Sequence, residues 1–254
     1  MGYEATLKTI SSEEFSASES IIDTNYFGVK SAKVILKKAC VSDQIQNELL
    51  NFLENFEFVV ITNQANDPCN NQWLGEKSKA FLTDINVQFR KEASETEAIP
   101  PSIRIADTFP ENFQILRIAE NAFTVSRFLN DPYLPVEKAK HIYADMARNA
   151  FGTKGRFFVT YQEKETIGGF LLFSIDFDHS SSTIELIAID QSFIGRGAGR
   201  SLIRAMENYV FKEAVNTIKV GTQLNNMSAL SFYTSCGFRY AECSSIYHYW
   251  PLRS

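Results

Sequence analysis

Histidine and cysteine are scarce in this 254-residue chain, and neither residue type forms a metal-binding pattern. The four cysteines include no Cys-x-x-Cys pair, and the three histidines do not stand at ligand spacing from them. These residues are Cys40, Cys69, Cys236, Cys243, His141, His179 and His248. We therefore expect no metal site, and reduced thiols are the simplest interpretation of the cysteines.

Long apolar runs and an excess of basic charge are also absent. The longest apolar runs are of strand length, well below the roughly 20 residues of a membrane-spanning helix. Residues 1–20 carry no signal-peptide pattern. A net charge of −5 gives no electrostatic footprint for nucleic acid. With 44% hydrophobic residues to fill a core, we expect a cytoplasmic globular protein with neither nucleic-acid binding nor membrane insertion.

A glycine-rich turn follows an apolar strand in the C-terminal third of the chain. Residues 184–190 read Ile-Glu-Leu-Ile-Ala-Ile-Asp, and residues 191–200 open an amphipathic helix. A helix N-terminus exposes backbone N–H groups and favours negative charge, so this turn is predicted to bind phosphate. The residues assigned to that role are Gly195, Arg196, Gly197, Ala198, Gly199 and Arg200. The alternative is an ordinary helix start that happens to contain glycines.

Two better-known phosphate motifs do not fit this turn. No Gly-Lys-Ser/Thr follows it, which disfavours a nucleoside-triphosphate P-loop. No second βαβ half follows either, which disfavours a dinucleotide-binding fold. The sequence therefore favours a phosphate-bearing ligand other than a nucleoside triphosphate or a dinucleotide for this turn.

A second motif lies downstream, with the spacing Asn-x-x-Ala-x-x-x-Tyr-x-x-x-Gly-Phe. Asn226 is placed to cap a helix, and Tyr233 lies four residues after Ala229, on the same helix face. Gly237 ends the helix, and Phe238 begins a strand. A core tyrosine and a purely structural cap are the alternatives for these two polar residues.

Together the two motifs resemble the acyl-CoA-binding core of the GNAT acetyltransferase superfamily. The resemblance implies a mixed-sheet α/β fold, acetyl-CoA as co-substrate, and direct transfer of the acetyl group to an amine. It implies that Tyr233 protonates the departing CoA thiolate and that Asn226 hydrogen-bonds the pantetheine arm. Backbone N–H groups near Ile187 and Ile189 would polarise the acetyl oxygen in a V-shaped opening between two parallel strands.

One position departs from the family pattern. The family usually has Gln or Arg three residues before its first fixed glycine, which is matched here by Gly197, but this chain has Ile194. We expect weaker CoA affinity as a result.

Glu185 is the best candidate for the base that deprotonates the amine; it could instead face solvent or pair with an arginine.

The order of predicted elements suggests two α/β units with a boundary near residue 100. Residues 1–100 form a smaller N-terminal α/β domain, expected to contribute to an acceptor cleft, and residues 101–254 form the GNAT domain. In the first domain we predict a helix over 43–55, strands over 56–62 and 81–90, a turn-rich loop over 63–71 and a linker over 91–102. In the second, the predicted helices are 112–130, 136–149, 199–214 and 228–236, and the strands are 156–162, 167–176, 183–190, 217–222 and the closing strands of 238–250.

A second resemblance concerns the acceptor. Residues 117–135, with Ser126-Arg127-Phe128 and Asp131-Pro132, resemble the first helices of TDP-4-amino-4,6-dideoxygalactose (TDP-fucosamine) N-acetyltransferases. Residues 23–28 and 247–250 resemble the ends of that group. The resemblance implies a TDP-amino-sugar substrate for surface polysaccharide, with Arg127 on a nucleotide phosphate and Phe128 stacking on sugar or base. An ordinary helix end is the alternative for these two residues.

Two other functions remain open at this level. One is acetylation of a protein N-terminus, a polyamine or another small amine, and the other is a non-catalytic acyl-CoA-binding module. Retention of Tyr233 and Asn226 argues against the second. A homodimer through edge strands also stays open.

Overall fold

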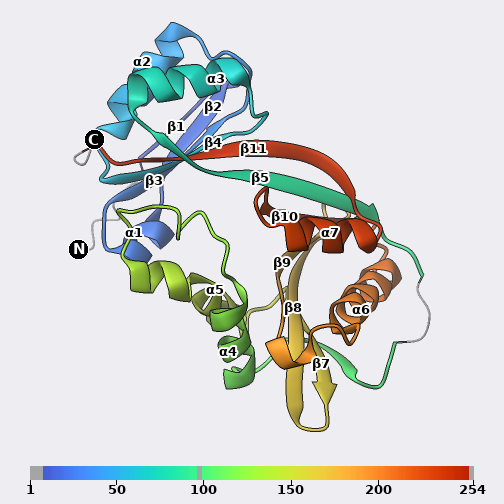
Figure 1. Ribbon diagram of the computed structural model, residues 1–254. Helices are drawn as coiled ribbons and strands as arrows, with labels where there is room; N and C mark the ends of the chain where they lie inside the picture. Colours follow the sequence, from blue (N-terminus) through green and yellow to red (C-terminus); the bar gives the residue numbers. More distant parts are fainter. Residues whose placement is uncertain (1–7, 96–98, 252–254) are drawn as a thin grey trace, which may run out of the picture. The chain divides into compact units, whose positions relative to one another are not determined.

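The computed structural model describes residues 8–95 and 99–251 (Figure 1). The chain forms two compact units, which we call unit 1 (Met1–Val87, Arg127–Lys138 and Glu242–Ser254) and unit 2 (Gln88–Ser126 and Ala139–Ala241). We expected a single boundary near residue 100, but unit 1 also includes two segments that lie beyond it, Arg127–Lys138 and Glu242–Ser254. Two strands, β5 (Phe81–Glu92) and β11 (Arg239–Tyr249), have residues in both units.

Unit 1 contains a mixed sheet with the strand order β1-β2-β3-β4-β11-β5. Its further elements are β1 (Thr9–Ser11), β2 (Phe15–Glu19), α1 (Ile21–Phe27), β3 (Ser31–Leu36), α2 (Asp43–Leu53), β4 (Phe58–Asn63), α3 (Pro68–Trp73) and a π-helix (Leu74–Ser78). β3 and β4 run parallel, and α2 connects them. The core beneath α2 includes Leu36, Leu49, Phe52, Val59 and Ile61. The predictions for α2, β4 and β5 are confirmed.

The loop expected over residues 63–71 is partly helical, which corrects that prediction. Asp67 accepts the backbone N–H of Asn70 and so caps α3, and Pro68 occupies the first turn, where its missing N–H costs nothing. The run of asparagines that reads as a turn instead hydrogen-bonds within the loop: Asn63 donates to the side chain of Asn71, and Asn71 donates to that of Asn66.

Cys40 and Cys69 form a disulfide, so the prediction of reduced thiols is wrong for this pair. The two residues are 29 apart in sequence, and no short spacing announces the bond. Tertiary hydrogen bonds bring them together, because Cys40 donates its N–H to Asp67 and Val41 donates its N–H to Asn70. The Asp67 carboxylate lies within 4.8 Å of both sulfurs. Cys236 and Cys243 are free thiols.

Unit 2 contains a mixed sheet with the strand order β5-β10-β9-β8-β7-β6. Its elements are β6 (Ile103–Asp107), α4 (Phe113–Ala122), α5 (Val136–Ala150), β7 (Arg156–Glu163), β8 (Thr166–Asp176), β9 (Ser181–Ile189), α6 (Ala198–Lys212), β10 (Thr217–Gln223) and α7 (Met227–Ser235). Figure 1 shows α4 and α5 on one side of β7–β9 and α6 on the other. The first face packs Ile115, Ala147, Phe158, Phe170 and Leu186.

Most predicted elements of unit 2 are confirmed, including the β7–β8 hairpin. Two are corrected. The helix expected over 112–130 ends at Ala122, because Phe123 takes an extended backbone conformation. The closing strands of 238–250 are one long strand, β11, which pairs with β4 from Ser245 to Tyr249.

Across the residues with a described structure, no helix combines the length and the apolar character that crossing a bilayer requires.

Candidate active site

The parallel strands β9 and β10 of unit 2 part half-way along their length. They pair from Ser181 with Thr217 to Ile184 with Val220, and the pairing stops there although β9 continues to Ile189. At the same point the register of β9 against β8 shifts, so that Glu185 is left without an opposite residue. Such a bulge bends a strand and increases its twist. Beyond Ile184 and Val220 the two strands are not paired with each other, and we call this unpaired stretch between them the slot.

The slot is where the sequence places the acetyl group. Asp190 donates its N–H to Gly168 on β8, and successive amides of a strand point in opposite directions. We therefore infer that the N–H groups of Ile187 and Ile189 point away from β8, toward the slot. The Glu185 side chain is 16% exposed and pairs with Arg156 across 3.4 Å. Pairing with an arginine is the alternative to a role as base that the sequence left open for Glu185.

The glycine-rich turn leads directly from β9 into α6. Gly195 and Gly197 have φ of 82° and 77°, a left-handed backbone that favours glycine. Gly197 is also the N-cap of α6, which consequently has no side-chain cap. Gly199 lies against Phe232 of α7, where a Cβ would come within 3.1 Å of the ring. The first-turn amides of α6 are therefore available to a phosphate.

The two arginines of this turn have partners within unit 2. Arg196 lies 4.8 Å over the ring of Phe193 and pairs with Glu163 across 3.2 Å. Arg200 donates to the backbone oxygen of Ser235 at 3.1 Å. Their predicted contact with a pyrophosphate would replace or share these bonds.

Tyr233 and Asn226 lie on α7 as the spacing predicts. The side chain of Asn226 accepts the N–H of Ala229 at 3.1 Å, which confirms the cap. Tyr233 is 5% exposed, and its ring packs against Phe89 and Phe238. Burial raises the pKa of Tyr233, and the nearby Cys236 adds to the effect. The phenol therefore keeps its proton at neutral pH.

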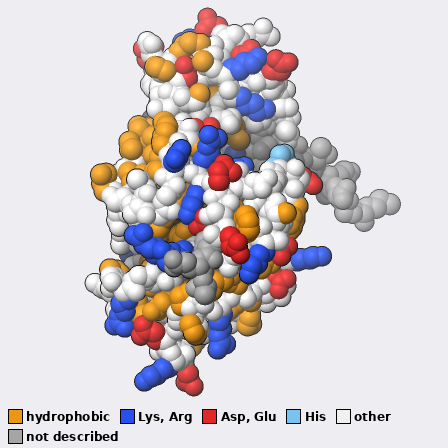
Figure 2. All heavy atoms as spheres, turned by 90° about the vertical axis from the view of Figure 1, so that its right-hand side faces the viewer, with side chains coloured by type: hydrophobic (Ala, Val, Ile, Leu, Met, Phe, Trp, Pro, Cys, Tyr) orange, Lys and Arg blue, Asp and Glu red, His pale blue; other side chains and the backbone are white. Residues whose placement is uncertain are grey.

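A polar cavity of about 330 Å³ lies beside α6 and the end of α7. Lys91 and the buried Glu207 form an ion pair of 2.6 Å in its wall, and Ser94 donates to the same carboxylate. Arg200, Arg204 and Cys236 also line it. Burial raises the pKa of Cys236 despite the cations beside it. Figure 2 shows Lys and Arg side chains mixed with Asp and Glu on the side of the molecule that faces right in Figure 1.

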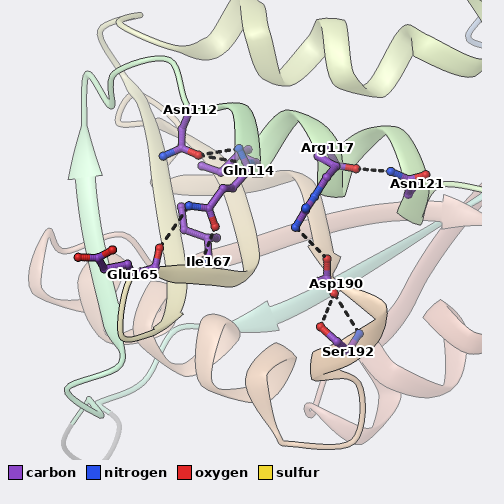
Figure 3. Close-up of polar contacts among 9 residues, drawn as sticks. Asn112, Gln114, Arg117, Asn121, Glu165, Ile167, Asp190 and Ser192 are labelled. Carbon is purple, nitrogen blue, oxygen red and sulfur yellow. Dashed lines mark hydrogen bonds and ion pairs between the residues drawn. The ribbon is translucent and has the colours of Figure 1, made fainter.

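Polar side chains of α4 hold this helix to the β7–β8 hairpin and to the residue that follows β9 (Figure 3). Gln114 donates to the backbone oxygen of Glu165 and accepts the N–H of Ile167. Arg117 reaches Asp190 across 3.7 Å. Asp190 in turn accepts from the backbone and hydroxyl of Ser192, which lowers its pKa. Nothing in the spacing of residues along the chain announces these contacts.

Arg127 and Phe128 lie in unit 1, so the structure does not bring them into the compact unit that holds Tyr233. Phe128 is only 8% exposed and packs against Phe27, and the Arg127 guanidinium lies 4.5 Å over its ring. Burial raises the pKa of the neighbouring Asp84 to about 6, although Arg127 lowers it.

Unit 1 also contains a fully buried polar group that the sequence did not indicate. His248 Nδ1 lies 2.6 Å from the Asp131 carboxylate, which also accepts the Trp250 N–H at 3.0 Å. Burial lowers the pKa of His248, and Asp131 opposes this. Desolvation would raise the pKa of Asp131, but hydrogen bonds from His248 and Trp250 hold it below its ordinary value.

Comparison with known proteins identifies the domain that carries the slot. Residues 122–238 match the family described as "Acetyltransferase (GNAT) family". Residues 122–238 therefore form a GNAT-family acetyltransferase domain. Members of this family use acetyl-CoA as co-substrate, and the chain is an acetyl-CoA-dependent N-acetyltransferase.

Similar proteins support this assignment. The "Spore coat polysaccharide biosynthesis protein SpsD" of Bacillus subtilis (strain 168) is 21% identical over 200 residues, which cover 78% of this chain and 68% of that protein. A GCN5-related N-acetyltransferase from Sphaerobacter thermophilus has a TM-score of 0.62 at 11% identity, covering 92% of this chain and 76% of that one. A tandem GNAT protein from the clavulanic acid biosynthesis pathway has a TM-score of 0.54 at 10% identity, covering 94% and 84%. These two structures show the fold and confirm the expected mixed-sheet GNAT architecture.

Proposed function

We propose that this GNAT acetyltransferase transfers the acetyl group of acetyl-CoA to the amine of a TDP-amino-dideoxyhexose, to make a precursor of surface polysaccharide. The resemblance of residues 117–135 to sugar-nucleotide acetyltransferases supports this acceptor, as does the similarity to a polysaccharide biosynthesis protein. The observation that carries it is the Arg127 guanidinium backed by the ring of Phe128, because a fixed planar cation suits bidentate binding of a nucleotide phosphate.

The structure refines the role proposed for Phe128. A ring that is 8% exposed offers little surface to a sugar or a base. In the proposal, Phe128 therefore acts by holding the guanidinium of Arg127, and Arg127 makes the contact with the phosphate.

In the proposed reaction, the unprotonated amine attacks the thioester carbonyl, and the tetrahedral intermediate then expels the CoA thiolate. The N–H groups of Ile187 and Ile189 stabilise the developing oxyanion, and one such donor is typically worth about 3 kcal/mol. Tyr233 gives its proton to the thiolate; burial raises the pKa of the phenol, so the proton is present at neutral pH when the C–S bond breaks.

Glu185 is the proposed acceptor of the proton that leaves the amine, directly or through a water molecule. It lies at the bulge where β9 leaves β10, and Arg156 holds its carboxylate. Asn226 remains the proposed partner of the pantetheine arm, because its side-chain nitrogen is not used by the cap, which its oxygen makes.

The experiment is free-thiol release from acetyl-CoA with a panel of TDP-3-amino and TDP-4-amino dideoxyhexoses, with spermidine and a short peptide as control amines. We expect release with one TDP-amino sugar. Arg127→Gln should raise the KM for that sugar about tenfold and leave the KM for acetyl-CoA unchanged. Arg148→Gln, at a half-exposed arginine of α5, is the matched control. Turnover of a control amine with silence across the sugars would refute the acceptor assignment.

A further inference from the structure

The phosphate loop, residues 191–200, is anchored through one aromatic ring. Phe193 is 8% exposed and lies directly on Gly168 of the neighbouring strand β8. A Cβ at Gly168 would come within 2.4 Å of the Phe193 ring, closer than any side chain tolerates. Gly168 also lies at the irregularity in the β7–β8 ladder, where the register passes from Gly169 to Ile167. A glycine inside a strand often marks such a close approach.

The same ring is fixed from two other directions. Tyr161 of β7 meets it edge-on with 6.3 Å between the ring centres, and the Arg196 guanidinium lies 4.8 Å over it. Glu163 joins these two neighbours, because it accepts from the Tyr161 hydroxyl at 3.0 Å and from Arg196 at 3.2 Å. We call the set of Tyr161, Gly168, Phe193 and Arg196 the Phe193 anchor.

Backbone hydrogen bonds connect the anchor to the loop amides. Phe193 donates its N–H to Asp190 at 2.8 Å, and its own oxygen accepts the N–H of Arg196. Asp190 is tied to Gly168 by its N–H and to Arg117 of α4 by its carboxylate. Gly195 and Gly197 follow within four residues of the ring. The position of the ring therefore sets where the amides of residues 195–200 point.

We propose that Gly168 and Phe193 are positioning residues for acetyl-CoA, which hold the phosphate loop so that its backbone amides bind the pyrophosphate without a polar side chain at position 194. Ile194 is 68% exposed and offers no hydrogen bond to a phosphate. A loop that lacks this side-chain contact depends more heavily on a fixed backbone, since each amide must already point at the anion.

A double-mutant cycle tests this anchor by calorimetric binding of acetyl-CoA, which needs no acceptor. Gly168→Ala should weaken binding about tenfold, because the added methyl group displaces the ring. Phe193→Ala should weaken it by a similar factor. The double variant Gly168→Ala/Phe193→Ala should bind no worse than Phe193→Ala alone, since the methyl group then has room.

Two readouts separate positioning from general damage to the fold. Pantetheine lacks the pyrophosphate, so its binding, followed by ligand-detected NMR, should not change in these variants. Gly75→Ala is the matched control, because a Cβ at Gly75 meets nothing within 4 Å; it should leave both affinities unchanged. If Gly168→Ala fails to fold, Phe193→Ala still decides. Unchanged acetyl-CoA affinity in Phe193→Ala, or equal losses for acetyl-CoA and pantetheine, would overturn the proposal whatever the acceptor is.

Discussion

Each unit contains a parallel strand–helix–strand segment, and the two segments differ in the feature that makes a cofactor site. In unit 1, β3 and β4 pair at all six positions, from Ser31 with Phe58 to Leu36 with Asn63. In unit 2, β9 and β10 are nine and seven residues long but pair at only four positions. The bulge at Glu185 is the difference. An uninterrupted ladder leaves no backbone for a ligand, whereas an interrupted one leaves a slot.

The loops that precede α2 and α6, the helices that connect the two pairs of parallel strands, differ in how many of their hydrogen-bonding groups have partners. Before α2, the N–H groups of Cys40 and Val41 bond to Asp67 and Asn70, and the Ser42 hydroxyl caps the helix. Before α6, Gly197 has no side chain with which to cap. One helix N-terminus is satisfied by its own chain and the other is left for a phosphate. The same supersecondary unit therefore has a capped helix start in one place and, in the other, an uncapped one to which we assign phosphate binding.

The largest expected effect comes from removing the Cys40–Cys69 disulfide of unit 1. Cys69→Ser should lower the free energy of unfolding by about 3.5 kcal/mol, because the disulfide closes a long loop of the unfolded chain. Urea unfolding measures this. Calorimetry should show unchanged acetyl-CoA affinity, because the loop of unit 1 binds no cofactor. A parallel loss of acetyl-CoA binding would contradict the division of roles.

The next effect concerns chemistry in the slot. Tyr233→Phe should lower turnover about a hundredfold with little change in the acetyl-CoA dissociation constant, because only the proton donor is lost. Tyr249→Phe removes the same atom from a buried tyrosine of unit 1 and should leave turnover unchanged. Thiol-release kinetics compare the two variants. Equal turnover in Tyr233→Phe and the parent would remove the assigned role.

A smaller effect tests the two helix N-termini. Gly197→Ala forces a side chain onto a residue with φ of 77°, and should weaken acetyl-CoA binding about tenfold through the strained loop. Ser42→Gly, the counterpart change at the cap of α2, should cost a few tenths of a kcal/mol of stability and no affinity. Calorimetry and thermal melts distinguish them. Loss of affinity in Ser42→Gly would show that the two segments are not independent.

The smallest effect is the response to acid. Burial depresses the pKa of His248 below its ordinary 6.5, so the unfolded chain binds a proton that the folded chain refuses. Stability should therefore fall as the pH drops below 6.5. Asp84, with a pKa raised to about 6 by burial, acts in the opposite direction because its folded form gains the proton first. In Asp84→Asn the opposing contribution is absent, so the melting temperature should fall as the pH drops below 6.5. The double variant Asp84→Asn/His248→Gln should show a smaller fall.

The sequence predicted best where short-range patterns decide the structure. The Asn226 cap, the β7–β8 hairpin and the glycine turn into α6 follow from residues close in the chain, and all are present. The end of α4 was missed because Phe123 leaves the helix without a proline or glycine to mark it. The π-helix after α3 likewise has no local sign.

Contacts between distant segments could not be predicted. Cys40 meets Cys69, Glu185 meets Arg156, and Phe193 lies on Gly168, in each case because the tertiary fold brings together residues that are far apart in the chain. The burial of Phe128 could not be predicted either. An aromatic residue near the end of the helix expected over 112–130 is consistent both with a ligand contact and with a place in the core.

The sequence by itself determined the local elements on which the proposed chemistry rests, because glycines, an asparagine and a tyrosine at fixed spacing specify an uncapped helix start and a capped helix that carries a tyrosine. The tertiary structure decided where that chemistry has room. Register in a sheet is a relation between strands, and only the folded chain shows that β9 bulges at Glu185 and parts from β10 while β3 stays paired with β4.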